Sequence, residues 1–428
     1  MSRSQFSRRQ FVQTSAAAAA AAMVPYWMPG KSLADDAKKN PLIFGCIGSN
    51  PAGRWSQIVP QILPLGNVVA VCDVDSRHAD GANARVGGKA DTYGDYRKLL
   101  DRKDIEAVTI TTPDHWHTKI AIAAMKAGKD VYCEKPLTLT VDEGQDICYV
   151  AKKTGRVFQV GTQQRSEFAG RFLQAVAMVH AGRIGKLQKI TAAIGTGPAL
   201  GPFAKMPVPP ELNWDVWLGQ APVADYTEHR CHGDFRWWYE YSGGKMTDWG
   251  AHHVDIATWA MNMGDSGPTT VEGTATFPNI PNGFNTAVTF QVHCKYDNGV
   301  DLLIRDDTEN GITFEGDQGT FFVNRGTIRG KPVDALKDDP LPKDALLKLH
   351  KGKPLGDHMA NFVECVRTRE QPISDVFTHH RALSTCHLAN IAIRLNRKLT
   401  IDPSIEQIIG DDEANAWLAR DQREPYQI

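Results

Sequence analysis

The fold of this chain is indicated by residues 42–53, LIFGCIGSNPAG. The first six residues form a continuously apolar run, which is typical of a parallel strand covered on both faces. The turn that follows has the spacing of the G-x-G-x-x-G phosphate loop but carries Asn50 in place of the middle glycine. Asparagine tolerates the left-handed backbone better than most residues, so the turn can still form. The segment therefore predicts the first strand and the phosphate loop of a dinucleotide-binding domain.

A second apolar run ends in Asp73, which lies 25 residues after Gly48. An acid at this position accepts hydrogen bonds from the ribose hydroxyls of adenosine, and its charge repels the 2′-phosphate of NADP. The residue therefore favours NAD, unless Arg77 reaches across to neutralise a phosphate. The alternative interpretation is that Asp73 caps the helix that follows.

The chain of 428 residues is longer than one hydrophobic core usually supports, so two domains are expected. Residues 41–165 alternate strand-like and helical segments, which predicts an α/β Rossmann domain with a doubly wound parallel sheet. Residues 166–428 are predicted to form an α+β substrate and oligomerisation domain with a large, mostly antiparallel open sheet. Its terminal helices, which begin near Asp357, are expected to return toward the first domain. The predicted strands are residues 42–47, 68–74, 107–111, 130–133 and 157–160, and then 188–194, 269–277, 286–296, 300–304, 311–315 and 319–323.

The charge balance narrows the range of partners. The 48 basic and 49 acidic side chains nearly cancel, which argues against nucleic acid and against an anionic membrane surface. We therefore expect a small, uncharged partner. The eight cysteines include no C-x-x-C pair and several lie in apolar runs, so they are predicted to be buried and reduced.

The N-terminus has the features of an export signal. Residues 7–12, SRRQFV, precede an alanine-rich run that extends to Met28, and residues 32–34, SLA, have the small-x-small pattern of a cleavage site. Residues 1–34 therefore resemble a twin-arginine signal, with residues 35–40 as a linker. The alternative is an amphipathic or membrane-anchoring helix, which Pro25 and Pro29 disfavour because they end the run early. We expect a protein that is soluble after export to the periplasm or elsewhere outside the cytoplasm.

Two motifs follow neighbouring strands of the predicted parallel sheet. Residues 111–117, TTPDHWH, follow one strand, and residues 133–136, CEKP, follow the next. Ligands of open parallel sheets lie outside the carboxyl ends of the strands, so both motifs face the same crevice. Lys135 is then aimed at the nicotinamide end of the cofactor, although a lysine after a strand is more often a solvated loop residue.

A further motif lies in the second domain at residues 243–255, GGKMTDWGAHHVD. On one helix, Asp248, His252 and Asp255 project from the same face and form a group of proton-handling side chains. Such a face can serve acid/base catalysis, bind a divalent ion together with His253, or close a polar network. We assign no metal, because the spacing differs from that of H-E-x-x-H. Flanking aromatic residues form either a sugar-stacking platform or a packed core: Trp214, Trp217, Trp237, Trp238, Tyr239 and Tyr241.

The order of these motifs, with GTQQR at residues 161–165, resembles the glucose–fructose oxidoreductase and inositol dehydrogenase family (Gfo/Idh/MocA). The closing stretches HMANFV at 358–363 and CHLAN at 386–390 are similar to members with export signals. The resemblance extends from about Pro41 to the C-terminus and implies that Lys135, Asp248 and His252 are catalytic. Expected cofactor contacts are Gly48, Asn50, Ala52, Gly53, Asp73, Thr112, Pro113, His117, Glu134, Lys135 and Gln163, and expected substrate contacts are Arg165, Trp238, His253 and Asp255.

The function implied is an NAD-dependent oxidoreductase that transfers a hydride from or to a CH–OH group of a sugar, polyol or cyclitol. His252 is the expected acid/base, Lys135 polarises the reacting oxygen, and Asp248 orients its partners. Because free NAD is not expected outside the cytoplasm, the cofactor is predicted to be tightly held. The alternatives are a redox-neutral glycosidase, lyase or epimerase that forms a keto-sugar, and a non-catalytic sugar-binding protein. The open second-domain sheet also predicts a homo-oligomer.

Overall fold

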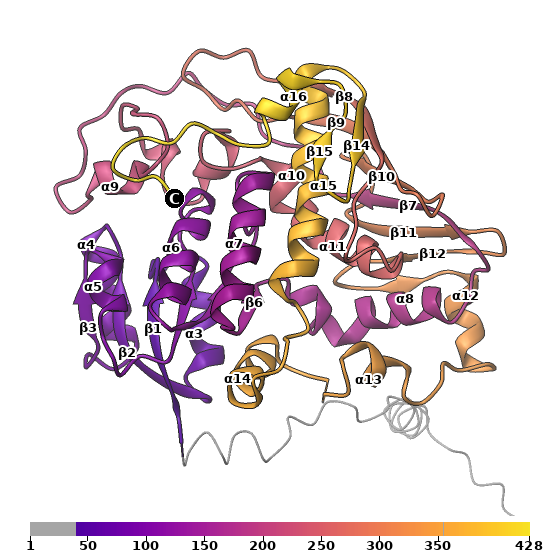
Figure 1. Ribbon diagram of the computed structural model, residues 1–428, viewed down its shortest axis with the longest axis horizontal. Helices are drawn as coiled ribbons and strands as arrows, with labels where there is room; N and C mark the ends of the chain where they lie inside the picture. Colours follow the sequence, from indigo (N-terminus) through magenta and orange to yellow (C-terminus); the bar gives the residue numbers. More distant parts are fainter. Residues whose placement is uncertain (1–39, 354) are drawn as a thin grey trace, which may run out of the picture.

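The computed structural model describes residues 40–353 and 355–428. The predicted export signal, residues 1–34, lies outside the described residues, as do residues 35–39 of the predicted linker. The described chain forms two domains that lie side by side, with the first in indigo to purple in Figure 1. None of the helices in this part of the chain is both long enough and apolar enough to cross a membrane.

The first domain is built around a parallel sheet whose strands in the described ranges have the order β3-β2-β1-β4-β5-β6. This is the order of a doubly wound dinucleotide-binding sheet, and it confirms the predicted fold. The sequence pattern missed β3, because this edge strand has three residues and is mostly exposed. The strands are β1 Leu42–Ile47, β2 Gly66–Cys72, β3 Asp91–Tyr93, β4 Ala107–Ile110, β5 Asp130–Cys133 and β6 Phe158–Val160.

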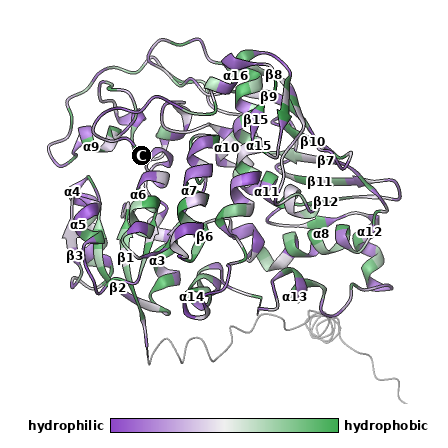
Figure 2. Ribbon diagram, viewed as in Figure 1, coloured by the Kyte–Doolittle hydropathy of each residue, from purple (hydrophilic) through white to green (hydrophobic). Residues whose placement is uncertain are grey.

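Hydrophobic cores cover both faces of this sheet. On β1 the side chains of Phe44 and Cys46 belong to one core, and that of Ile47 belongs to the other. Figure 2 shows the hydrophobic residues along these central strands. Burial on both faces explains why the strands are continuously apolar. The helices of this domain are α3 Trp55–Ile62, α4 Ser76–Arg85, α5 Tyr96–Leu100, α6 Asp114–Lys126 and α7 Val141–Thr154.

The second domain contains a mixed sheet whose order, over the described residues, is β13-β12-β11-β7-β10-β9-β8-β14-β15. In this part of the chain β7 and β10 pair in parallel and the other neighbours are antiparallel, which confirms the mostly antiparallel sheet. The strands are β7 Leu187–Ala193, β8 Thr270–Thr276, β9 Thr289–Lys295, β10 Asp301–Arg305, β11 Gly311–Gly316, β12 Thr320–Val323, β13 Ile328–Arg329, β14 Leu399–Asp402 and β15 Gln407–Ile408.

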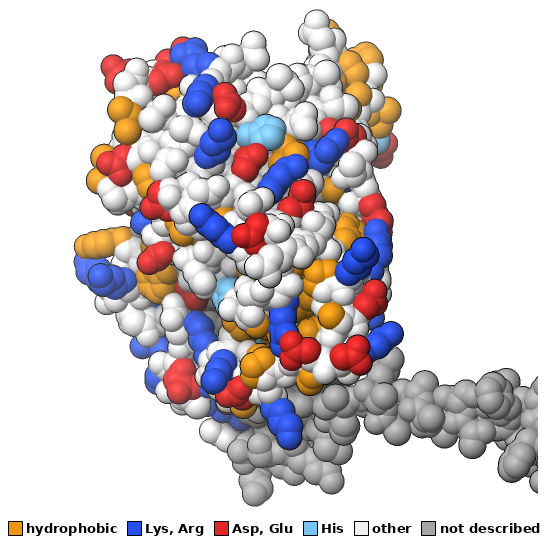
Figure 3. Space-filling view, turned by 90° about the vertical axis from the view of Figure 1, so that its right-hand side faces the viewer, with side chains coloured by type: hydrophobic (Ala, Val, Ile, Leu, Met, Phe, Trp, Pro, Cys, Tyr) orange, Lys and Arg blue, Asp and Glu red, His pale blue; other side chains and the backbone are white. Residues whose placement is uncertain are grey.

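One face of the second sheet is covered by helices and the other is polar. On β9, Phe290 and Val292 are buried, whereas Gln291 and Lys295 are exposed. Figure 3 shows this side of the molecule, where Lys and Arg side chains are interspersed with Asp and Glu. The homo-oligomer expected from the open sheet stays a prediction. The covering helices are α8 Arg171–His180, α11 Gly250–Ala260 and α15 Val376–Leu395.

Two helices near the C-terminus pack against the first domain. The ring of Phe362 on α14 His358–Thr368 lies 6.4 Å from that of Phe44 on β1, and α15 packs against α7. The other helices described are α9 Trp214–Leu218, α10 Lys245–Asp248, α12 Lys331–Asp334, α13 Ala345–Leu349 and α16 Asp412–Ala416.

The eight cysteines all lie in the described ranges and are free thiols there. Seven are buried, as predicted, whereas Cys148 is half-buried.

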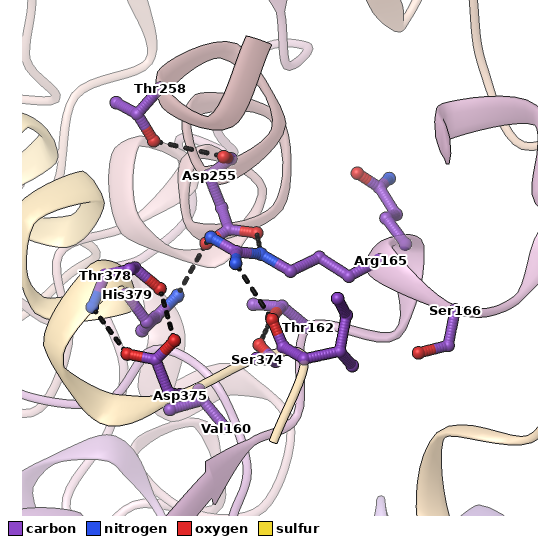
Figure 4. A network of polar contacts seen from close by, with 12 residues as sticks. Val160, Thr162, Arg165, Ser166, Asp255, Thr258, Ser374, Asp375, Thr378 and His379 are labelled. Atoms are coloured by element: carbon purple, nitrogen blue, oxygen red, sulfur yellow. Dashed lines mark hydrogen bonds and ion pairs between the residues drawn. The ribbon is translucent and has the colours of Figure 1, made fainter. Parts of the chain in front are cut away.

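A buried ion pair joins the two domains (Figure 4). Arg165 follows β6 of the first domain, and its Nε and Nη2 donate to the Asp255 carboxylate of α11 at 2.7 and 2.8 Å. The same guanidinium donates to the Ile373 carbonyl, and His379 of α15 contacts Asp255 at 3.3 Å. The Asp255 side chain has no exposed surface. This network therefore holds α11 and the start of α15 against the segment that leaves the parallel sheet.

We predict that Asp255→Asn lowers the free energy of unfolding by about 3–5 kcal/mol, because Arg165 then keeps a buried charge without its counterion. Chemical denaturation monitored by tryptophan fluorescence measures this change. Asp344→Asn, which breaks the exposed pair with Lys348, is the control and should leave stability nearly unchanged. Equal stability of the Asp255→Asn variant and the parent would contradict the role given to this pair.

Candidate active site

A cleft of about 1650 Å³ lies between the domains at the carboxyl ends of β1, β4 and β5. This exceeds the roughly 300–1,000 Å³ of a site for one small molecule, so the cleft has room for a dinucleotide and a second ligand. All of the predicted cofactor and catalytic residues line it: Gly48, Asn50, Ala52, Gly53, Asp73, Thr112, Pro113, His117, Glu134, Lys135, Gln163, Asp248 and His252.

The phosphate loop forms without its middle glycine. Gly48 has φ of 80°, and a Cβ there would lie 2.4 Å from the Thr112 nitrogen, so this position requires glycine. Asn50 does not adopt the left-handed backbone conformation that asparagine tolerates. Its side-chain oxygen instead accepts a hydrogen bond from the Ala52 amide at 2.9 Å and closes the turn.

The carboxylate of Asp73 is available to a ligand at the end of β2. The N-cap of α4 is Asp75, which accepts from the Arg77 amide, so the capping alternative for Asp73 is wrong. Asp75 also binds the Arg77 guanidinium at 2.7 and 3.1 Å. Asp73 accepts from the Asp75 amide at 3.0 Å and lies 3.5 Å from His78. The tight Gly48 turn and this acid together fit a dinucleotide.

Buried polar contacts hold the strand-end loops in place. The two ring nitrogens of His117 lie 2.9 Å from the Thr112 carbonyl and 2.7 Å from the Pro136 carbonyl, so this ring joins the loops after β4 and β5. Glu134 is 3% exposed and binds Arg54 of the phosphate loop at 3.0 Å and Gln163 at 2.9 Å. Glu134 therefore positions its neighbours.

Lys135 and Asp248 meet across the domain boundary. The Lys135 ammonium donates to Asp248 Oδ1 at 2.5 Å and to the Asp248 carbonyl at 2.8 Å. Arg236 binds the same carboxylate oxygen at 3.3 Å. Burial opposes ionisation of Asp248, but the two cations outweigh it and lower the pKa to about 2. Asp248 is therefore charged, and it holds Lys135 in place.

The imidazole of His252 lines the cleft beside this ion pair. Burial, followed by the charges of Lys135 and Arg325, lowers its pKa well below the ordinary value of 6.5. The ring is therefore neutral at physiological pH. Its Nδ1 is buried and has no hydrogen-bond partner among the described residues, so no bond from this nitrogen fixes the tautomer.

The four expected substrate residues lie outside the cleft lining. Trp249 separates α10 from α11, so Asp248, His252 and Asp255 do not share one continuous helical face. Asp255 lies one turn deeper than His252 on a helix that is almost wholly buried, and there it binds Arg165. His253 is buried and pairs with Asn310 at 3.0 Å.

Five of the six aromatic residues near this motif belong to or pack against a separate hydrophobic core, whereas Tyr239 lies against Trp417. Trp238 is 2% exposed, packs on the Arg230 guanidinium and donates to the His229 carbonyl at 2.6 Å. Core packing, one of the two interpretations, therefore accounts for Trp238. Trp217 belongs to the same core but also reaches the cleft.

Among the described residues, no group of three or more His, Cys, Asp or Glu side chains is arranged to hold a metal ion. Several cleft residues were not identified from the sequence, because they come from separate parts of the chain. Arg54 directly follows the phosphate loop and could have been found from that position. Asp114 lies inside the TTPDHWH motif, and the others follow no motif with a known spacing: Arg236, Arg325 and Tyr426.

Both domains match models of known protein families. The model for the "Oxidoreductase family, NAD-binding Rossmann fold" matches residues 39–162, and that for the "Oxidoreductase family, C-terminal alpha/beta domain" matches residues 199–428. The chain belongs to the Gfo/Idh/MocA oxidoreductase family. Residues 5–25 of this Gfo/Idh/MocA protein match the twin-arginine translocation signal, which confirms the predicted signal.

Relatives of this Gfo/Idh/MocA protein include inositol 2-dehydrogenase of Salmonella typhimurium, which is 34% identical over 144 residues. The match covers 33% of this chain and 41% of that enzyme, less than half its length. The WlbA dehydrogenase of Bordetella pertussis, solved with NADH and UDP-GlcNAcA, has a TM-score of 0.62 at 18% identity over 85% of this chain and 99% of that one. The aldose-aldose oxidoreductase of Caulobacter crescentus, solved with glycerol, has a TM-score of 0.60 at 17% identity over 84% of this chain and 100% of that one. These two structures share the fold.

We predict that Asp73→Asn reduces the preference for NAD over NADP by about tenfold, because the substitution removes both a charged acceptor for the ribose and the repulsion of a 2′-phosphate. Dissociation constants of the two nucleotides, measured by calorimetry on nucleotide-free protein, give this ratio. Asp101→Asn changes an exposed carboxylate outside the cleft and serves as the control. An unchanged ratio in the Asp73→Asn variant would remove Asp73 from the ribose site.

Proposed function

We propose that this protein is an NAD-dependent oxidoreductase that acts on a CH–OH group of a sugar, polyol or cyclitol and keeps its cofactor tightly bound. The observation that carries the proposal is the Lys135–Asp248 pair beside a neutral His252 at the carboxyl end of β5. The bound nicotinamide ring supplies hydride chemistry. The phosphate loop and Asp73 are the residues that would hold the dinucleotide.

Lys135 is suited to bind the reacting oxygen. An ammonium group has three donors, and two of them are used by the carbonyl and carboxylate of Asp248. The third remains for the substrate oxygen, where it stabilises the negative charge that develops when the carbinol loses its hydroxyl proton. Asp248 contributes by positioning Lys135, and Arg236 helps to hold Asp248.

His252 is suited to take that proton. A general base must be unprotonated at the working pH, and burial together with the cations around His252 keeps the ring neutral. In the opposite direction the protonated ring returns the proton to the carbonyl oxygen. The two residues therefore divide the work, with Lys135 stabilising charge and His252 moving the proton.

The substrate class is supported by the names of relatives. An inositol dehydrogenase matches part of this chain, and an aldose-aldose oxidoreductase shares its fold. The twin-arginine signal supports both a location outside the cytoplasm, such as the periplasm, and a resident cofactor, because exported protein meets little free NAD.

The same signal favours a second candidate, a redox-neutral glycosidase, lyase or epimerase that forms a transient keto-sugar. Both candidates use Lys135 and His252. They are distinguished by incubating the purified mature protein with sugars and glycosides while absorbance of reduced nicotinamide is followed. Net reduction supports the dehydrogenase, and product without net reduction supports the redox-neutral enzyme.

We predict that Lys135→Met lowers kcat by about 100–1,000-fold, because the developing alkoxide loses its charged donor. The measurement is turnover of the sugar that reduces the nucleotide bound to the parent enzyme. Bound nucleotide is quantified in the variant to show that the cofactor is still held. Lys245→Met, in the same region but outside the cleft, is the matched control. Full turnover by the Lys135→Met variant would overturn both catalytic candidates.

The low pKa of His252 predicts how carbinol oxidation depends on pH. The base is active when it is neutral, so the rate should stay constant as the pH falls through 6.5 and should decline only at lower pH. A pH profile of kcat/KM tests this. A decline of about tenfold per pH unit that begins near 6.5 would show that His252 titrates as an ordinary histidine or is not the base.

A further inference from the structure

Arg325 reaches the cleft from the turn between β12 and β13. Its guanidinium lies between two aromatic rings, 4.7 Å from the centre of Phe168 and 4.7 Å from the centre of Trp249. Within the described residues it forms no ion pair with a carboxylate, and its buried Nε has no hydrogen-bond partner. Trp249 directly follows Asp248, so this unpaired cation stands beside the proposed reaction centre.

The local backbone holds this side chain in a fixed place. Arg171 Nη1 donates to the carbonyls of both Phe168 and Arg325, at 2.9 and 3.2 Å, and so ties the two segments together. Asn324 closes the turn by accepting from the amides of Gly326 and Thr327 at 2.9 Å. Phe168 and Ala169 have φ of 58° and 55°, a left-handed backbone that bulky residues seldom adopt. A strained segment therefore presents the ring on which Arg325 stacks.

The other cations at this end of the cleft have partners. Arg54 binds Glu134, and Lys135 and Arg236 share Asp248. Two further carboxylates line this part of the cleft, Glu167 and Asp114, and neither forms an ion pair within the described chain. Burial and the neighbouring Asp357 raise the pKa of Glu167 to about 7, so it is only partly charged at neutral pH. Burial also raises the pKa of Asp114, which accepts a hydrogen bond from Ser242. This part of the cleft therefore carries an excess of positive charge.

We propose that Arg325 binds an anionic group, a carboxylate or a phosphate, carried by the sugar substrate. This inference rests on the proposed function and names its substrate class more closely. A planar guanidinium held between rings presents its free N–H groups in a fork that matches either anion. The proposal departs from the uncharged partner expected from composition, because the charge balance of the whole chain does not report the charge of one cleft.

The test is calorimetric titration of NAD-loaded protein with hexoses, the corresponding uronic acids and the corresponding sugar phosphates. In at least one stereochemical series we expect the acid or the phosphate to bind about tenfold more tightly than the neutral sugar. Arg325→Met should remove that difference and leave binding of the neutral sugar unchanged, because methionine still fills the space between the rings. A purely structural role would weaken all ligands alike.

Arg329→Met is the matched control. This arginine lies on the same hairpin and stacks on Phe322, but it is paired with Glu309 and does not line the cleft. It should leave all affinities unchanged. The proposal is overturned if anionic sugars bind no more tightly than neutral ones in every series, or if their advantage survives Arg325→Met. It is also overturned if Arg325→Met releases the nucleotide, because Arg325 would then be a cofactor residue.

The same titrations distinguish a carboxylate from a phosphate. They also distinguish failure of the anion proposal from failure of the proposed function. Preference for uronic acids identifies a carboxylate, and preference for phosphate esters identifies a phosphate. If a neutral sugar reduces the bound nucleotide but anionic sugars bind no more tightly than neutral ones, or keep their advantage in Arg325→Met, the anion proposal fails while the proposed function stands. If anionic sugars bind through Arg325 but no sugar in the series is turned over, the proposed function fails while the anion site stands.

Discussion

The buried pair between Arg165 and Asp255 is the constraint on which the arrangement of this molecule depends. It joins the segment that leaves the parallel sheet to α11, and the same network holds the start of α15. His252 lies one turn before Asp255 on α11, so the pair also sets where that ring stands relative to Lys135 on the other domain. A site assembled from two domains needs such a rigid link, because small displacements of the reacting groups strongly reduce catalysis.

Electrostatics at the reaction centre follow from this arrangement. Asp248 is shared by Lys135 and Arg236, which holds the lysine in place and leaves one of its donors for a ligand. Burial, together with the charges of Lys135 and Arg325, keeps His252 neutral. A neutral base beside a fixed cation is suited to remove a hydroxyl proton while the developing oxygen charge is stabilised. The positive charge that helps to keep His252 unprotonated also attracts an anionic ligand. The proposed role of His252 and the proposed anion site therefore share one physical origin.

The first domain and the residues that line its end of the cleft could be predicted from the sequence, because the topology of the parallel sheet determines where they lie. The carboxyl ends of parallel strands lie at the same edge of the sheet. Residues that directly follow β1, β2, β4 and β5 therefore lie close together at that edge. The substrate residues could not be predicted in this way. Arg165 and Asp255 carry the residue types of a catalytic site but are used to join the domains, and the break at Trp249 gives Asp248 and Asp255 different surroundings. Arg325 comes from a hairpin far along the chain, and no local pattern marks it.

The proposed reaction depends on hydride transfer between a carbinol carbon of the substrate and a nicotinamide held in the cleft. Its most direct test uses a sugar that carries deuterium at the reacting carbon, mixed with the nucleotide-loaded protein in a single turnover. The bound nucleotide is then released and examined by mass spectrometry. Deuterium is expected on the nicotinamide ring, and Lys135→Met is expected to slow this transfer by about 100–1,000-fold. Net reduction of the bound nucleotide without deuterium on its nicotinamide ring would contradict this transfer.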